Sequence, residues 1–167
     1  LLVDNVYASA SQTLCDFLYD YYEASKGNTP FFTTNNVGCS RAGFQKIGGF
    51  DESFPIAAAE DRDFGIRWRE QGGQLVYVPD AIVGHLHDLS FRRFMRQHSN
   101  YGRGAHHLHK VIDQREADTI KFEGLKFYLR LLSYPWTGDR RMRVRQTALM
   151  FMSQVAMVGG YVRARLS

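Results

Sequence analysis

The chain has 167 residues, of which 44% are hydrophobic and 14% aromatic, and its net charge is +4. This composition excludes an intrinsically disordered or fibrous protein, and the length suits one domain with a buried core. Nine lysines and arginines follow residue 120 against two acids, whereas the part before it has more acids than bases. A basic tail on an acidic body favours contact with an anionic surface over contact with nucleic acid, because the acidic body would repel a polyanion.

The first fifty residues predict two helices with a strand between them. Apolar side chains at helical spacing predict a helix over residues 6–25. The aromatic and β-branched run 31–34 predicts a short strand. A second helix over 41–47 should end at Gly48 and Gly49, because glycine readily adopts the positive φ that ends helices.

An acidic helix is predicted next, over about 60–71. Its first residues are Glu60-Asp61-Arg62-Asp63, and three alanines precede them. Two explanations of Glu60 and Asp61 stay open. The acids could cap the helix, which stabilises it by roughly 0.3–1 kcal/mol. Alternatively they form a cleft wall, where a neighbouring carboxylate raises the pKa of a general base. The pattern Asp61-x-Asp63 is a weak indicator of a metal site, because side chains two positions apart on a helix point about 200° apart.

Residues 74–78 and 81–83 predict extended strands, and the second of them ends near His85. A histidine at a strand end is more often a hydrogen-bonding residue than a ligand, but α/β proteins bind ligands at the carboxyl edge of the sheet. Both roles of His85 stay open. The alternation of strands and helices predicts an α/β fold.

Ser90 is predicted to cap a further helix, which should stop near Tyr101-Gly102-Arg103-Gly104. Arg96 and Arg103, with Gln97 and Tyr101, form a basic and polar end of this helix that suits phosphate oxygens, and a solvated helix face is the alternative. The histidines at 106, 107 and 109 are interpreted as a solvated face as well, since adjacent histidines on a helix point to different sides.

Residues 119–167 are predicted as a basic, amphipathic helical tail that follows a first unit over 1–118. The apolar run 147–162 has 16 residues, short of the ~20 needed to span a bilayer. Two interpretations stay open: a pair of helices packed on the body, or an interfacial segment with arginines 140, 141, 143 and 145 at lipid headgroups. The two cysteines match no disulfide or zinc pattern, which favours a reducing compartment. We therefore expect a cytoplasmic chain, with peripheral attachment to the inner face of the cell membrane as the alternative.

Several spaced blocks of the sequence agree, in order, with one enzyme family. Over roughly residues 30–105 the chain resembles the second half of a bacterial family 2 glycosyltransferase. The matching blocks are TTNNVGCSR at 33–41, IGGFDESFP at 47–55, AEDRD at 59–63 with Arg67-Trp68, then Gly72, Tyr77-Val78-Pro79, Ala81, Val83 and His85, and finally RQHSNYGRG at 96–104.

The resemblance implies the C-terminal half of a GT-A fold, a mixed sheet with flanking helices, followed by the helical tail. It implies inverting transfer of a sugar from a nucleotide-diphosphate donor to a hydroxyl of a saccharide or lipid-linked acceptor. Asp61 takes the role of general base, with Glu60 beside it in the acceptor pocket. Mg²⁺ or Mn²⁺ steadies the leaving diphosphate, and His85 contributes to the metal site. The residues expected to bind the donor or the acceptor are Asn36, Asp51, Arg96 and Arg103.

The nucleotide-binding half of the family, with its metal-binding Asp-x-Asp, has no counterpart before Gly38. We therefore expect the chain to be the acceptor-side portion of an enzyme that shares its metal with the other half and turns over little donor alone. Two alternatives stay open. One is a non-catalytic module for acceptor recognition or assembly, and the other is a metal-dependent hydrolase built on Asp61, Asp63 and His85.

Overall fold

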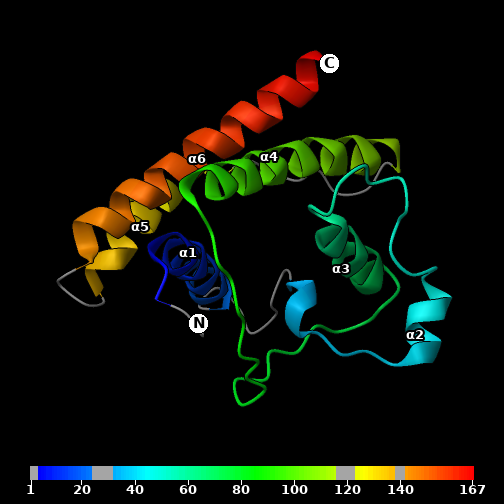
Figure 1. Ribbon diagram of the computed structural model, residues 1–167. Coiled ribbons are helices and arrows are strands. Elements are labelled where there is room, and N and C mark those ends of the chain that lie inside the picture. The colour runs from blue at the N-terminus through cyan, green and yellow to red at the C-terminus, as the bar shows by residue number, and fades with distance from the viewer. Residues whose placement is uncertain (1–3, 24–31, 116–122, 138–141) are drawn as a thin grey trace.

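The computed structural model describes residues 4–23, 32–115, 123–137 and 142–167, which form an assembly of helices (Figure 1). The three longest helices are α1 (Val6–Glu23), α4 (Phe91–Gln114) and α6 (Arg143–Leu166). The shorter elements are the 3₁₀ turns η1 (Thr34–Asn36) and η2 (Tyr134–Thr137) and the helices α2 (Arg41–Lys46), α3 (Glu60–Glu70) and α5 (Leu125–Ser133).

Helices α4 and α6 pack against each other along one side of the molecule (Figure 1). Glycines allow the close approach. A methyl group added at Gly102 of α4 would lie 1.8 Å from the carbonyl oxygen of Met157 in α6, and one at Gly160 would lie 1.9 Å from that of Ser99. Contacts this short do not occur, so any larger residue at either position would push the helices apart.

Two apolar clusters hold α1 and α5 to this pair, and a third packs α3 against the segments that precede and follow it. The cluster between α1, α5 and α6 consists of Leu14, Phe17, Phe127, Leu131 and Met150. The cluster between α1, α4 and α6 consists of Ala10, Leu89, Phe94 and Leu149. The cluster around α3 consists of Phe32, Ile47 and Phe64. Helices α5 and α6 are thus packed on the body, as the first interpretation of the tail predicts.

Two predicted helix starts are confirmed by serine caps. Ser40 Oγ accepts a hydrogen bond from the backbone N–H of Gly43 at 3.1 Å, at the start of α2. Ser90 Oγ accepts one from the N–H of Arg93 at 3.3 Å, at the start of α4. Each cap satisfies one of the amide groups that have no partner within the helix.

The predicted end of α4 near residues 101–104 is wrong, because the helix continues without a break to Gln114. Two glycines, Gly102 and Gly104, lie at the helix end that the sequence predicts. In the structure Gly102 faces α6 and Gly104 faces the backbone of Ala58, so both serve close packing between elements.

The predicted α/β fold, a mixed sheet with flanking helices, is wrong for the described residues, among which no strand forms. Residues 73–90 run as an irregular connection from α3 to α4, and part of the predicted strand 31–34 belongs to η1. A strand exists only where a neighbouring backbone offers a hydrogen-bonding ladder. The backbone of this connection forms no such ladder among the described residues, and its β-branched side chains are exposed, by 75% at Val76 and 85% at Ile82.

None of the helices in the described ranges combines the length and the apolar character that crossing a membrane requires. The predicted boundary between residues 118 and 119 lies outside the described residues, as do Arg140 and Arg141 of the tail.

Candidate functional site

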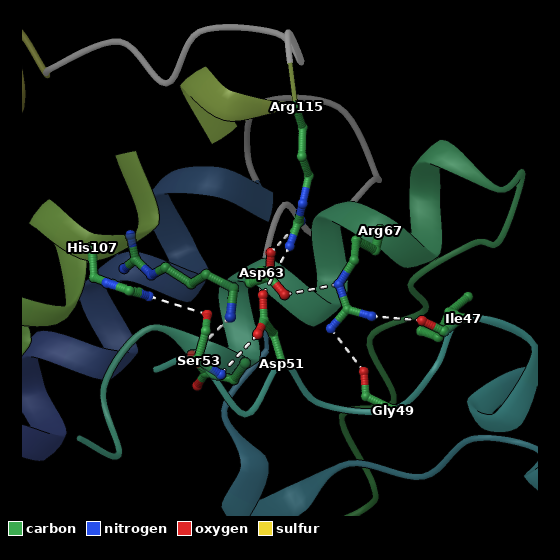
Figure 2. A network of polar contacts seen from close by, with 10 residues as sticks. Ile47, Gly49, Asp51, Ser53, Asp63, Arg67, His107 and Arg115 are labelled. Atoms are coloured by element: carbon green, nitrogen blue, oxygen red, sulfur yellow. Dashed lines mark hydrogen bonds and ion pairs between the residues drawn. The ribbon is translucent and has the colours of Figure 1, made fainter. Parts of the chain in front are cut away.

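A buried carboxylate fixes the first turn of α3. The side chain of Asp63 is 0% exposed, and two arginines bind it (Figure 2). Arg67, one helical turn later, places Nε 2.8 Å from Oδ2, and Arg115, at the C-terminal end of α4, places Nη1 2.6 Å from Oδ1. A buried charge needs this kind of pairing to be tolerated. Asp63 is therefore committed to the fold, and both of its oxygens are occupied.

The same two arginines hold the glycine turn that precedes α3 (Figure 2). Arg67 donates from Nη1 to the carbonyl oxygen of Ile47 and from Nη2 to that of Gly49, both at 2.7 Å. Arg115 Nη2 lies 3.0 Å from Asp51 Oδ2. The turn, the start of α3 and the end of α4 are thus joined in one polar clamp, made of Asp51, Asp63, Arg67 and Arg115.

Ser53 and His107 extend this clamp. The N–H of Ser53 donates to Asp51 Oδ1 at 2.9 Å, and Ser53 Oγ lies 3.3 Å from His107 Nε2 (Figure 2). Hydrogen bonds from Ser53 hold the pKa of Asp51 below its usual range, and the charge of Arg115 adds to the effect. Asp51, predicted to bind donor or acceptor, is engaged in these contacts. His107, interpreted as solvated, packs instead on the Gly48–Phe54 segment.

The backbone that leads into α3 adopts an unusual conformation. Ala59, the residue before the helix, has φ of 73°, and it is the one non-glycine residue with positive φ in the described ranges. A methyl group at Gly104 of α4 would lie 2.2 Å from the carbonyl oxygen of Ala58, so α4 presses directly on this loop. Such strain costs about 1–3 kcal/mol and is concentrated at functional sites. It therefore draws attention to the two residues that follow.

Those residues are Glu60 and Asp61, which lie in the first turn of α3, after Ala59 at the N-cap position. Burial raises the pKa of Asp61 above its usual value. A hydrogen bond from the N–H of Arg62 lowers it, and the charge of Glu60 raises it further. Glu60 Oε2 is buried and has no hydrogen-bond partner among the described residues. Perturbed pKa values of this kind occur both in proton-transferring sites and in structural networks, so the pair is a candidate site.

An open cavity of about 560 Å³ lies between one face of α4 and the connection that precedes this helix. It is lined by Ala57, by His87, Asp88 and Leu89 from the connection before α4, and by Arg93, Arg96, Gln97, Asn100 and Tyr101 from α4. Tyr101 joins the cavity to the acids: burial raises the pKa of its hydroxyl, and the nearby charges of Asp61 and Glu60 add to the rise. Glu60 and Asp61 do not line the cavity themselves, and Tyr101 is the lining residue on which their charges act.

Arg96, Gln97 and Tyr101 belong to the polar helix end that the sequence predicts, whereas the other cavity residues were not predicted. A signal for Arg93 was present, because Arg93, Gln97 and Tyr101 are spaced four residues apart and so share a helix face. The spacing does not show which segment lies against that face, because this depends on the packing of α4 on the Ala58 loop.

Two predicted binding residues lie away from the cavity wall. Arg103 is one turn beyond Asn100 and donates to its Oδ1 at 3.4 Å, so it contacts a lining residue without lining the cavity itself. Asn36 donates from Nδ2 to the carbonyl oxygen of Ala81 at 2.6 Å and joins η1 to the connection between α3 and α4. The structure therefore places Arg96 in the cavity wall and Glu60 and Asp61 near Tyr101 of the same wall, and it leaves Asn36 apart.

His85, the predicted metal ligand, is exposed, and its ring centroid lies 5.2 Å from that of His87. His87 lines the cavity, and burial lowers its pKa, with a further decrease from His85. Within the described part of the chain, no three His, Cys, Asp or Glu side chains come together as a metal site would require. The residues present do not form a site for Mg²⁺ or Mn²⁺ by themselves.

Comparison with known families gives this geometry its context. The model of the family described as glycosyl transferase family group 2 matches residues 4–162. The chain belongs to this family. The resemblance seen in the spaced sequence blocks is thereby confirmed. Membership of this family supports sugar transfer in general.

Two curated relatives of this family 2 chain are pre-mycofactocin glycosyltransferases from Mycobacterium tuberculosis, of strains CDC 1551 / Oshkosh and ATCC 25618 / H37Rv. Each is 33% identical over 69 residues. The aligned segment is 41% of this chain and 14% of each relative, so the chain aligns with a small part of their length. No solved structure matches the chain.

Proposed function

We propose that the chain supplies the acceptor side of an inverting glycosyltransferase, with Asp61 as the general base. The observation that carries the proposal is the pair at the start of α3. Asp61 has a pKa raised by burial, and Glu60 has a buried oxygen without a partner among the described residues. The charges of both acids act on Tyr101, which lines a cavity with two arginines. A base works best when its pKa lies near the working pH, and a raised pKa moves an aspartate in that direction. Membership of the family supports a nucleotide-diphosphate sugar as donor and a hydroxyl group as acceptor.

The proposed reaction is a single displacement. The acceptor hydroxyl transfers its proton to the carboxylate of Asp61 as its oxygen attacks the anomeric carbon of the donor sugar. The bond from that carbon to the diphosphate breaks, its electron pair leaves with the diphosphate, and the configuration inverts. The unsatisfied oxygen of Glu60 accepts a hydrogen bond from the acceptor and so orients it.

The arginines of the cavity have a matching role. The leaving diphosphate gains negative charge, and Arg93 and Arg96 would stabilise it by charge-assisted hydrogen bonds. Arg103 would hold Asn100 in place from one turn away. No step of this mechanism depends on a metal ion, and a role of His85 in metal binding stays a prediction.

The Arg96→Ala variant tests the cavity as the diphosphate subsite. In the intact protein that carries this chain, the donor KM is expected to rise about tenfold or more, because one charge-assisted hydrogen bond is lost. The affinity for inorganic pyrophosphate, measured by calorimetry, should fall by a similar factor. Arg92→Ala is the matched control: Arg92 is exposed on the same helix and does not line the cavity. Equal effects of the two substitutions, or none from Arg96→Ala, would contradict this placement of the diphosphate.

The alternatives are less well supported. A hydrolase that uses Asp63 as a metal ligand needs a carboxylate free to bind the ion, whereas both oxygens of Asp63 are held by arginines. A purely acceptor-binding module needs no base, and the raised pKa of Asp61 favours a proton-transferring role over simple binding.

A further inference from the structure

One face of α6 is apolar and faces away from the rest of the protein. Its members follow one another at intervals of three and four residues, which places them in a single stripe along the helix. Among the larger ones, the exposed fraction ranges from 47% at Val162 to 82% at Leu166. The stripe consists of Val144, Ala148, Phe151, Val155, Val158, Val162 and Leu166.

The stripe is separate from the face by which α6 joins the fold. Leu149, Met150, Ser153 and Gly160 are the buried residues of α6, and they pack against α1, α4 and α5. Helix α6 is therefore apolar on two sides, of which one is covered. With 24 residues the helix is about 36 Å long, so the uncovered stripe is far longer than a single exposed side chain.

The charges beside the stripe are of one sign. Helix α6 contains four arginines and no aspartate or glutamate. Arg145 near its start and Arg163 and Arg165 near its end are exposed. The half-exposed Trp136 lies against the first turns of the helix, where its Nε1 donates to Thr147 Oγ1 at 3.2 Å. Arginine, tryptophan and an apolar stripe together are typical of helices that lie in the interface of a membrane.

A second copy of the chain fits this stripe poorly. In a parallel pair of α6 helices each arginine would meet its own copy, and in an antiparallel pair Arg145 would meet Arg163 or Arg165. Both arrangements place like charges side by side without an acidic partner on α6. An anionic surface, in contrast, complements the charge at both ends of the helix at once.

We propose that the exposed stripe of α6 docks the chain on an anionic lipid surface, with the helix axis parallel to the membrane plane. The side chains of the stripe enter the apolar boundary of the bilayer, and the exposed arginines contact the headgroups. This attachment is peripheral and adds a membrane partner to the proposed transfer reaction, without depending on it.

Vesicle flotation of the purified chain tests the docking. The chain should float with vesicles of phosphatidylcholine mixed with phosphatidylglycerol, and it should remain unbound with phosphatidylcholine alone. The double variant Val155→Gln/Val158→Gln should lower the partition by about tenfold or more, because it removes two apolar contacts. The variant Arg163→Gln/Arg165→Gln should lower it by a similar factor and weaken its salt dependence.

The matched control is Val76→Gln/Ile82→Gln, which replaces two apolar residues that are even more exposed, in the connection between α3 and α4. It should float like the wild type, and circular dichroism should show the same helix content for all variants. Absence of flotation, equal flotation with neutral vesicles, or an equal loss in the control would overturn the proposal. So would a dimer in light scattering that only Val155→Gln/Val158→Gln dissociates, since a second copy would then cover the stripe.

Discussion

Replacing Asp61 with asparagine is expected to lower kcat for sugar transfer by about 10²–10⁴-fold, the range that general-base catalysis contributes. Asparagine keeps the shape and the hydrogen bond to the N–H of Arg62 but cannot accept the acceptor's proton. The donor KM should remain nearly unchanged, because Asp61 acts on the acceptor hydroxyl. The measurement is a steady-state assay with labelled nucleotide-diphosphate sugar in the intact protein.

Asp113→Asn is the matched control for this substitution. Asp113 is exposed near the end of α4 and lies outside the cavity, so the same chemical change there should leave kcat close to that of the wild type. If Asp61→Asn retained most of the activity, with its fold intact by circular dichroism, another group would have to be the base.

Replacing Asp63 with asparagine is expected to lower the free energy of unfolding by about 3–5 kcal/mol, the usual cost of breaking a buried ion pair from one side. The substitution leaves Arg67, which also holds the glycine turn, without its anion and leaves Arg115 with Asp51 alone. Urea denaturation followed by circular dichroism measures the change.

Asp51→Asn provides the comparison, because Asp51 binds the same Arg115 but its side chain is 25% exposed. Water screens such a pair, so its loss should cost only about 1 kcal/mol. Equal costs for the two aspartates would show that burial of Asp63 is not what makes the clamp important.

The helix starts could be predicted from local sequence because their causes are local. A serine that caps its own helix, as Ser40 and Ser90 do, needs no distant partner to be recognised. The same holds for Gly48 and Gly49, whose φ values of 80° and 69° are the conformation that glycine permits most readily.

The strands could not be predicted in this way, because pairing depends on a neighbour that the local sequence does not specify. Val76, Tyr77 and Val78 have the composition of a strand, yet they lie exposed in an irregular connection. The length of α4 was underestimated for a related reason. Gly102 and Gly104 look like a stop signal until the elements packed on them, α6 and the Ala58 loop, are known.

The sequence predicts that the acidic segment is functional, but it does not distinguish the roles of the individual acids. Glu60, Asp61 and Asp63 look alike in the sequence, and their differences arise from partners far along the chain. Asp63 meets Arg115 across 52 residues, whereas Glu60 and Asp61 make no ion pair with any described residue. Only the fold separates the structural carboxylate from the proposed catalytic pair.

The most direct test of the central claim is the pH dependence of kcat in the wild type and in Glu60→Gln. A base is active when deprotonated, so kcat should fall as the pH drops through the raised pKa of Asp61. The charge of Glu60 contributes to that rise, and its removal should shift the acidic limb to lower pH. An acidic limb that stays in place, or that moves to higher pH, would contradict the role of Asp61 as the base beside Glu60.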